Sequence, residues 1–160
     1  MRSFRFSQHI DRSPEEVFAF MMDFSNASRW RNMVRRMEVV NGGPVHEGSK
    51  VLLTMDVMGK AIQVEAEVWR YQPPHKFGMR NTRQGVTGVF EYVLEPDATG
   101  TTVTFTSDIR PHGLMWLTMP LLLLSNRNRY RDQLAALKRA MDLQRAQGPH
   151  KLDALESGTA

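Results

Sequence analysis

The chain has 160 residues, a length typical of one domain built around one hydrophobic core. Hydrophobic residues make up 41% and charged residues 24%, a balance that excludes disorder of the whole chain. Cysteine is absent, which excludes disulfides, thiolate metal sites and cysteine nucleophiles and is compatible with the reducing cytoplasm. Residues 1–11 also lack the continuous apolar stretch of a signal peptide, so we expect a cytoplasmic protein.

The net charge is +4, and much of the basicity falls in two clusters of arginines. One cluster lies near residue 30 and the other near residue 129: Arg29, Arg31, Arg35 and Arg36, then Arg127, Arg129 and Arg131. Neither has the interleaved exposed aromatic residues of a protein that binds single strands, and the chain has no nucleic-acid-binding motif. We therefore expect solvated basic faces and no nucleic-acid partner.

The N-terminal segment predicts one strand and two short helices. Residues 4–10 alternate in polarity, as in a half-buried strand. Ser13-Pro14-Glu15-Glu16 is a strong helix start, because Ser13 and Glu16 match a capping box and Pro14 suits the first helical position. Ser25 or Asn26 is expected to cap a second short helix that carries Trp30.

Alternating segments then predict about six further strands, bounded by turn-forming residues such as the pair of prolines at 73–74. They cover residues 34–40, 50–58, 62–69, 77–83, 88–94 and 101–109. Their short connections favour an antiparallel meander.

A long helix is expected from about Pro120 to Gly148, with an apolar stripe through Leu121, Leu134, Leu137 and Met141. Residues 148–160 are expected to form a disordered tail, which leaves one folded domain over residues 1–147. The apolar segment 114–124 is shorter than the roughly 20 residues that span a bilayer.

Several short segments occur in a characteristic order: Ser13-Pro14-Glu15-Glu16-Val17-Phe18, Asp23, Trp30 with Val34, Tyr71-Gln72-Pro73-Pro74, Phe90 to Pro96, Gly100 to Phe105, and Leu134 to Lys138. In this order and spacing, residues 3–143 resemble the START-like or SRPBCC superfamily, which includes polyketide cyclase/dehydrase-like proteins and lipid-transfer domains. The resemblance implies an α+β helix-grip fold, in which a curved antiparallel sheet of about seven strands and a long C-terminal helix enclose a cavity. Members include enzymes, carriers and receptors, so the fold does not determine the function.

One face of the sheet is expected to be wet, with Gln63, Glu65, Glu67, Glu91 and Glu95. The opposite face is apolar and is expected to line the cavity, with polar exceptions that hydrogen-bond a ligand or, alternatively, one another, the backbone or water. The predicted ligand-binding residues are Trp30, Met37, Met55, Val64, Met79, Asn81, Phe90, Tyr92, Phe105, Ser107, Leu117 and Leu121.

No catalytic residue is predicted, because the acidic residues of the strands share the register of exposed positions. The five histidines are far apart, which argues against a metal site, and no nucleotide-binding motif or other sign of a cofactor is present. His112 is the best candidate for proton chemistry at the cavity rim, although plain surface hydration is favoured for it. An inward-facing Arg, Asp or His is not evident.

Three functions are compatible with these observations. The preferred hypothesis is a binding module for a hydrophobic small molecule such as a lipid, polyketide or isoprenoid. The first alternative is a metal-free enzyme similar to polyketide cyclases or dehydrases, which work largely by orienting a reactive chain. The second alternative is lipid or quinone handling at a membrane surface, through residues 114–124 and the arginines that follow. The oligomeric state is left open.

Overall fold

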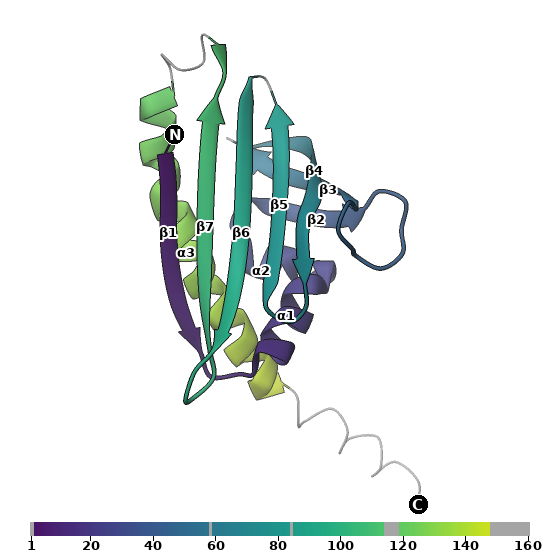
Figure 1. The fold of residues 1–160 in the computed structure, drawn as a ribbon, viewed down its shortest axis with the longest axis vertical. Helices are drawn as coiled ribbons and strands as arrows, with labels where there is room; N and C mark the ends of the chain where they lie inside the picture. The colour runs from purple at the N-terminus through teal and green to yellow at the C-terminus, as the bar shows by residue number, and fades with distance from the viewer. Residues whose placement is uncertain (1, 58, 84, 114–118, 148–160) are drawn as a thin grey trace, which may run out of the picture.

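The structure is a computed structural model that describes residues 2–57, 59–83, 85–113 and 119–147, with side chains left undescribed at positions 2 and 119–127. Within the described residues, seven strands, three α-helices and the short 3-10 helix η1 form a single sheet-and-helix assembly (Figure 1). In chain order they are β1 (Arg2–Ile10), α1 (Pro14–Met22), η1 (Phe24–Asn26), α2 (Ala27–Trp30), β2 (Val34–Val39), β3 (Lys50–Val57), β4 (Lys60–Gln72), β5 (Lys76–Arg83), β6 (Val86–Pro96), β7 (Thr101–Pro111) and α3 (Met119–Gln147).

The first helix begins at the predicted capping box. The backbone N–H of Glu16 donates to Ser13 Oγ at 3.3 Å, and the backbone N–H of Ser13 donates to Glu16 Oε2 at 3.1 Å. The bond from the Ser13 backbone holds the pKa of Glu16 below its ordinary value. The start of the next helical segment differs from the prediction, which had Ser25 or Asn26 as the cap. The side chain of Asp23 caps η1, and Asn26 precedes α2 without a side-chain cap.

The sheet has the order β1-β7-β6-β5-β4-β3-β2, and every neighbouring pair is antiparallel. Consecutive strands from β2 to β7 pair with one another, through the loop 40–49 between β2 and β3 and through short turns thereafter, which confirms the predicted meander. The two strands at the edges, β1 and β2, are consecutive in the chain, so α1, η1 and α2 must connect opposite edges across one face. Register shifts interrupt β2 at Val34/Arg36 and β4 at Val68/Arg70, and such bulges bend a sheet.

The two faces of the sheet have the predicted chemistry. Val51, Val64 and Ala66 are buried on the face toward the helices. On the opposite face, Lys50 pairs with Glu65 at 3.3 Å, and Arg80 pairs with Glu67 at 2.9 Å. Since alternate residues of a strand point to opposite faces, the alternation in the sequence was enough to divide the sheet into a wet and a dry side.

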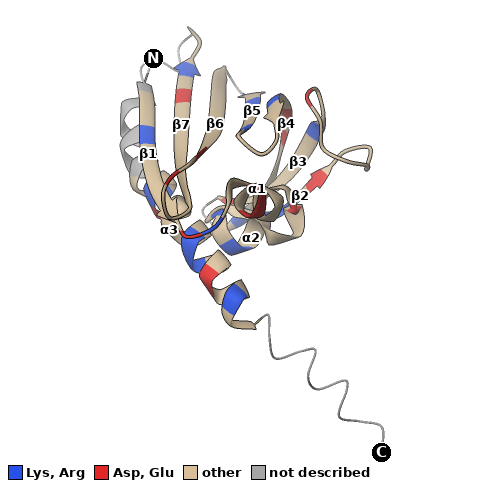
Figure 2. Ribbon diagram, turned by 60° about the horizontal axis from the view of Figure 1, so that its bottom comes forward, with Lys and Arg blue, Asp and Glu red and all other residues tan. Residues whose placement is uncertain are grey.

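Helix α3 packs against the same face, beside α2 and β1 (Figure 1). Its buried stripe contains Leu134, Leu137 and Met141, as predicted, and Pro120 lies in its first turn. Basic and acidic residues occupy the outer side of its C-terminal part (Figure 2), where Lys138 pairs with Asp142 at 3.1 Å. These features confirm the helix-grip fold. The predicted tail, residues 148–160, lies outside the described residues. None of the described helices is long and apolar enough to cross a membrane.

Candidate functional site

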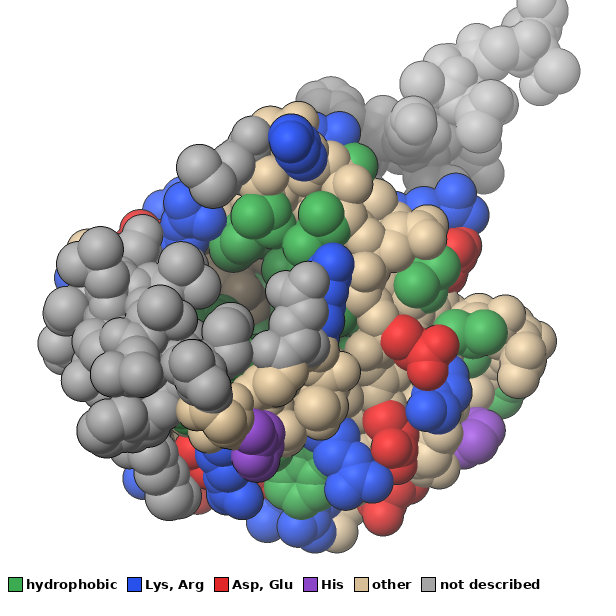
Figure 3. Space-filling view, turned by 90° about the horizontal axis from the view of Figure 1, so that it is seen from above, with side chains coloured by type: hydrophobic (Ala, Val, Ile, Leu, Met, Phe, Trp, Pro, Cys, Tyr) green, Lys and Arg blue, Asp and Glu red, His purple; other side chains and the backbone are tan. Residues whose placement is uncertain are grey.

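A cavity lies between the buried face of the sheet, the segment that joins α2 to β2, and α3. Its volume is about 110 Å³, and its mouth is open to solvent. Seen from above, the surface is hollowed where hydrophobic side chains gather, with basic side chains beside the hollow (Figure 3). The lining residues are Arg31, Asn32, Met33, Val34, Leu53, Met55, Val64, Ala66, Met79, Asn81, Phe90, Tyr92, Phe105, Arg129, Tyr130 and Gln133.

The sheet brings many of the predicted ligand-binding residues together around this cavity. They come from strands β3 to β7: Met55, Val64, Met79, Asn81, Phe90, Tyr92 and Phe105. Gly88 leaves room for two of them, because a Cβ there would lie 2.9 Å from Asn81 Oδ1 and from the ring of Phe90. The sequence therefore located the strand side of the cavity.

The other predicted residues are not among the described lining residues. Trp30 and Met37 are buried in the core, and Trp30 meets the ring of Tyr92 edge-on at 5.8 Å. Ser107 is fully buried, and its Oγ has no hydrogen-bond partner among the described residues. Leu117 lies outside the described residues, and only the backbone of Leu121 is described, within α3.

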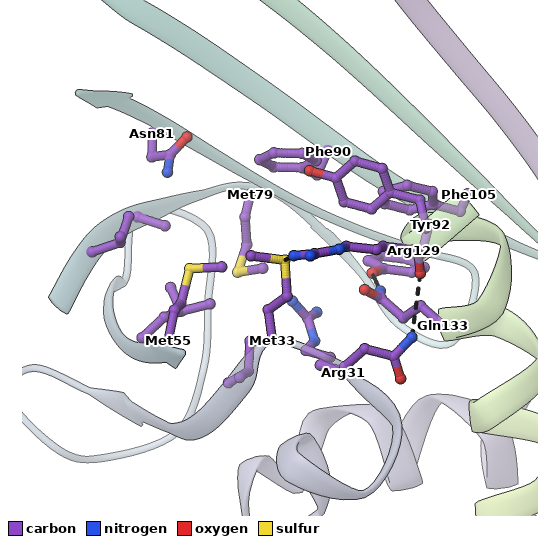
Figure 4. Close-up of a pocket in the computed structure, with 16 residues that line it drawn as sticks. Arg31, Met33, Met55, Met79, Asn81, Phe90, Tyr92, Phe105, Arg129 and Gln133 are labelled. Atoms are coloured by element: carbon purple, nitrogen blue, oxygen red, sulfur yellow. Dashed lines mark hydrogen bonds between the residues drawn. The ribbon is translucent and has the colours of Figure 1, made fainter. Parts of the chain in front are cut away.

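The apolar part of the cavity is built from methionines and aromatic rings (Figure 4). Met33, Met55 and Met79 line it with flexible, polarisable side chains that adapt to different ligand shapes. Opposite them, the ring of Phe90 stacks on Phe105 with centroids 6.3 Å apart, and Tyr130 packs against both. Such a lining excludes sugars and other strongly polar molecules, because it offers them few hydrogen bonds.

Tyr92 provides a hydroxyl at the polar end of the cavity. Its hydroxyl oxygen accepts a hydrogen bond from Gln133 Nε2 of α3 (Figure 4). Burial raises the pKa of Tyr92, so the phenol stays protonated at neutral pH, and the same effect raises the pKa of Tyr130 to about 12. Since the oxygen accepts from Gln133, the hydroxyl hydrogen remains available to donate to a ligand.

Arg31 corrects an expectation from the sequence. Its side chain is only 7% exposed and lines the cavity, whereas the arginine clusters were expected to be solvated. The guanidinium carbon lies 4.7 Å from the ring centroid of Trp30 and 5.5 Å from that of Tyr92. Its Nε and Nη2 are buried without a hydrogen-bond partner among the described residues.

Arg129 is exposed, as the sequence predicted, and it also lines the cavity. It reaches across the cavity toward Met33, and its Nη1 lies 3.5 Å from the sulfur of that residue (Figure 4). Asn32 Nδ2 donates to the backbone carbonyl of Arg129 at 3.4 Å, which links the α2–β2 segment to α3. Two cationic side chains therefore line one cavity.

The described lining contains neither a carboxylate nor a histidine. His112 is exposed and its Nε2 lies 3.1 Å from Thr87 Oγ1, away from the lining residues. Asp108 pairs with Arg110 at 2.6 Å. Among the described residues, no group of acidic or histidine side chains is arranged to hold a metal ion. The site can therefore bind an apolar body and donate hydrogen bonds, but these residues offer no general base.

Comparisons with known proteins agree with this architecture. Residues 1–142 match a family model described as "Polyketide cyclase / dehydrase and lipid transport". No curated protein matches the chain significantly. Among solved structures, the di-domain ARO/CYC BexL from the BE-7585A biosynthetic pathway is similar with a TM-score of 0.72 and 17% identity, over 93% of this chain and 48% of that chain.

Two further solved structures are similar to this chain over nearly their whole length. A protein from Mesorhizobium loti has a TM-score of 0.70 and 12% identity, over 88% of this chain and 97% of that chain. A START superfamily protein from Mycobacterium smegmatis has a TM-score of 0.65 and 12% identity, over 91% and 97%. At such low identity these likenesses concern the fold alone.

Proposed function

The chain belongs to the polyketide cyclase/dehydrase and lipid transport family, and on this premise we propose that its cavity binds a hydrophobic small molecule. The observation that carries the proposal is the lining itself. Methionine, leucine, valine, alanine and phenylalanine side chains form nine of the sixteen lining residues. The other seven carry polar groups, which can orient an apolar ligand by one end.

A neutral apolar dye provides the most direct test. N-phenylnaphthylamine (NPN) fluoresces when it leaves water, so titration with it reports an apolar site. We expect saturable binding to the wild type, and loss of at least about tenfold in affinity when Ala66→Phe fills the cavity. Glu65→Phe is the matched control, because it adds the same ring to the same strand on the exposed face.

Folding of each variant is checked by circular dichroism and thermal melting before titration. Absence of saturable NPN binding to the wild type would contradict the proposal. So would a folded Ala66→Phe variant that binds NPN like the wild type, since the dye would then sit elsewhere.

A cyclase or dehydrase-like activity on the bound molecule is the second candidate. It is supported by Arg31 and Tyr92, whose N–H and O–H groups can stabilise an oxygen that gains negative charge during reaction. Native mass spectrometry of protein from its own host separates the candidates, because it gives the mass of the molecule in the cavity. A ligand with the mass of the compound that entered the cavity supports carriage, and a ligand lighter than that compound by one water supports turnover.

Handling of lipid at a membrane surface would depend on residues 114–124, whose side chains lie outside the described part of the structure. Flotation with anionic liposomes at low salt tests this alternative independently of the cavity. Absence of binding under those conditions would exclude it.

A further inference from the structure

We infer that the molecule bound in the cavity is an apolar organic acid, whose anionic oxygen pairs with the guanidinium of Arg31. This inference rests on the proposed function, because it assumes that the cavity binds a small molecule, and it adds the chemical class of that molecule. It depends on three properties of the site: an unpaired buried cation, the placement of that cation, and the absence of acidic residues around it.

Arg31 is the one buried charged side chain in the described part of the chain. It forms no salt bridge with a described carboxylate, and its Nε and Nη2 lack hydrogen-bond partners there. Buried donors are almost always paired in native proteins, and a buried unpaired charge is especially unfavourable. A site that retains such a cation beside a cavity is suited to a ligand that carries the missing negative charge.

The placement of the guanidinium also favours an oxygen anion. Its carbon lies over the rings of Trp30 and Tyr92, at 4.7 and 5.5 Å from their centroids, so two cation–π contacts hold the charge beside the cavity. The buried Nε and Nη2 keep their hydrogen-bonding capacity, since neither has a partner among the described residues. Planar N–H donors match the oxygens of a carboxylate, so Arg31 can pair with such a group.

The electrostatic balance of the cavity points in the same direction. Arg31 and Arg129 both line it, and the described lining contains no Asp or Glu. The buried charge of Arg31 attracts an anion more strongly than it would in water, and the exposed Arg129 adds a weaker attraction that solvent screens. The hydroxyl of Tyr92, protonated because burial raises its pKa, adds a neutral donor at the same end. Methionines and aromatic rings then surround the apolar body of the ligand.

Two dyes with the same aromatic skeleton test this inference. Anilinonaphthalene sulfonate (ANS) is NPN with one added sulfonate, so the ratio of their affinities measures the preference for negative charge. We expect wild-type protein to bind ANS at least about tenfold more tightly than NPN, because a charge-assisted pair contributes at least that much. Arg31→Met should weaken ANS binding about 30-fold or more and leave NPN binding within about threefold.

Arg139→Met is the matched control, since it removes an exposed arginine of α3 that does not line the cavity. It should change the affinity for neither dye. Arg31→Lys keeps the charge but loses the planar donors, so ANS binding should fall to a value between those of the wild type and Arg31→Met.

Competition experiments on the wild type do not depend on how well a variant folds. Dodecanoate should displace bound NPN at a concentration at least about tenfold lower than dodecanol, which has the same chain without the charge. Equal displacement by both compounds would overturn the inference. An equal loss of ANS binding in Arg31→Met and Arg139→Met would also overturn it, because the sulfonate would then bind a general basic surface.

The same measurements separate this inference from the function on which it rests. If NPN binds in the cavity without any preference for the anion, the acid class is wrong and the binding function stands. If NPN does not bind the wild type at all, both are wrong.

Discussion

Two groups of polar residues in this molecule differ in how completely they are paired. The first lies at the ends of β1 and β6, where His9 bridges two carboxylates, with its Nδ1 2.9 Å from Asp97 and its Nε2 2.7 Å from Asp11. The second is the polar end of the cavity, where Arg31 has buried donors without partners and Tyr92 retains a free hydroxyl hydrogen.

The difference indicates what each group contributes. The His9 cluster is exposed and its charges are paired within the chain, so it connects strand ends and contributes a little stability. The cavity group is buried and incomplete, which lowers stability unless another molecule completes it. Residues that bind ligands often reduce stability in this way, since they are arranged for a partner that is absent during folding. Three substitutions test the comparison.

The largest effect is expected from Arg31→Met. Methionine keeps a long apolar chain against the two rings but removes the unpaired charge, so the free energy of unfolding of the ligand-free protein should rise by about 1–3 kcal/mol. Urea unfolding measures this change in the free energy of unfolding. Arg139→Met, at an exposed position, should change the value by no more than about 0.5 kcal/mol. A clear loss of stability in Arg31→Met would mean that stacking outweighs the cost of burying the charge.

A smaller effect of opposite sign is expected from Tyr92→Phe. This substitution removes the acceptor for Gln133 while it keeps the ring contacts with Trp30 and Phe105, so the free energy of unfolding should fall by about 0.5–1.5 kcal/mol. Tyr71→Phe, at a half-buried tyrosine of β4 outside the cavity lining, is the control. If both variants unfold at the same urea concentration as the wild type, the bond to Gln133 contributes nothing measurable.

The smallest effect concerns His9 and depends on pH. Hydrogen bonding to Asp97 raises the pKa of His9, so its contribution is complete below its ordinary pKa of 6.5 and is lost as the pH rises through the folded value. Bonds from the Thr99 backbone lower the pKa of Asp97 to about 2, so its contribution is present above its ordinary pKa of 3.8 and is lost as the pH falls toward 2.

The raised pKa of His9 and the lowered pKa of Asp97 together define a window between about pH 4 and pH 6.5 in which the cluster is most stabilising. His9→Gln should therefore lower the Tm by about 1–2 °C at pH 5 and by less at pH 8. His46→Gln provides the comparison, since the ring of His46 contacts a backbone carbonyl instead of a carboxylate. A constant difference across this pH range would exclude titration of His9 as the cause.

Much of the fold could be predicted because its signals are local. The capping box at Ser13, the alternation along residues 62–69 and the prolines at 73–74 each depend on residues close together in the sequence. The structure has α1 and β4 where these signals placed them. The start of η1 was missed because Ser25, Asn26 and Asp23 are all good capping residues, and the choice among them depends on how the chain leaves α1.

The cavity was predicted unevenly for a related reason. Period-two alternation identified Met79 and Tyr92 on the strands, but it does not apply to Arg31, which follows the last residue of α2 in extended conformation. Surrounded by other arginines, Arg31 had the pattern of a solvated face. Its position next to Trp30 was the available signal, because an arginine beside a buried tryptophan often stacks on it.

The sequence by itself determined the strands, the long helix and the apolar face of each, because the period of hydrophobic residues specifies which face of an element is buried. The resemblance to the superfamily added the expectation that these faces enclose a cavity. Only the tertiary structure decided what else enters that space. Arg31, Gln133 and Tyr92 are far apart in the chain, and they meet because α2 packs against α3 and the side chains of Arg31 and Gln133 both reach Tyr92 of β6. The arginine cluster that looked solvated thus contains the one buried charge of the described chain, and the charge of the expected ligand follows from it.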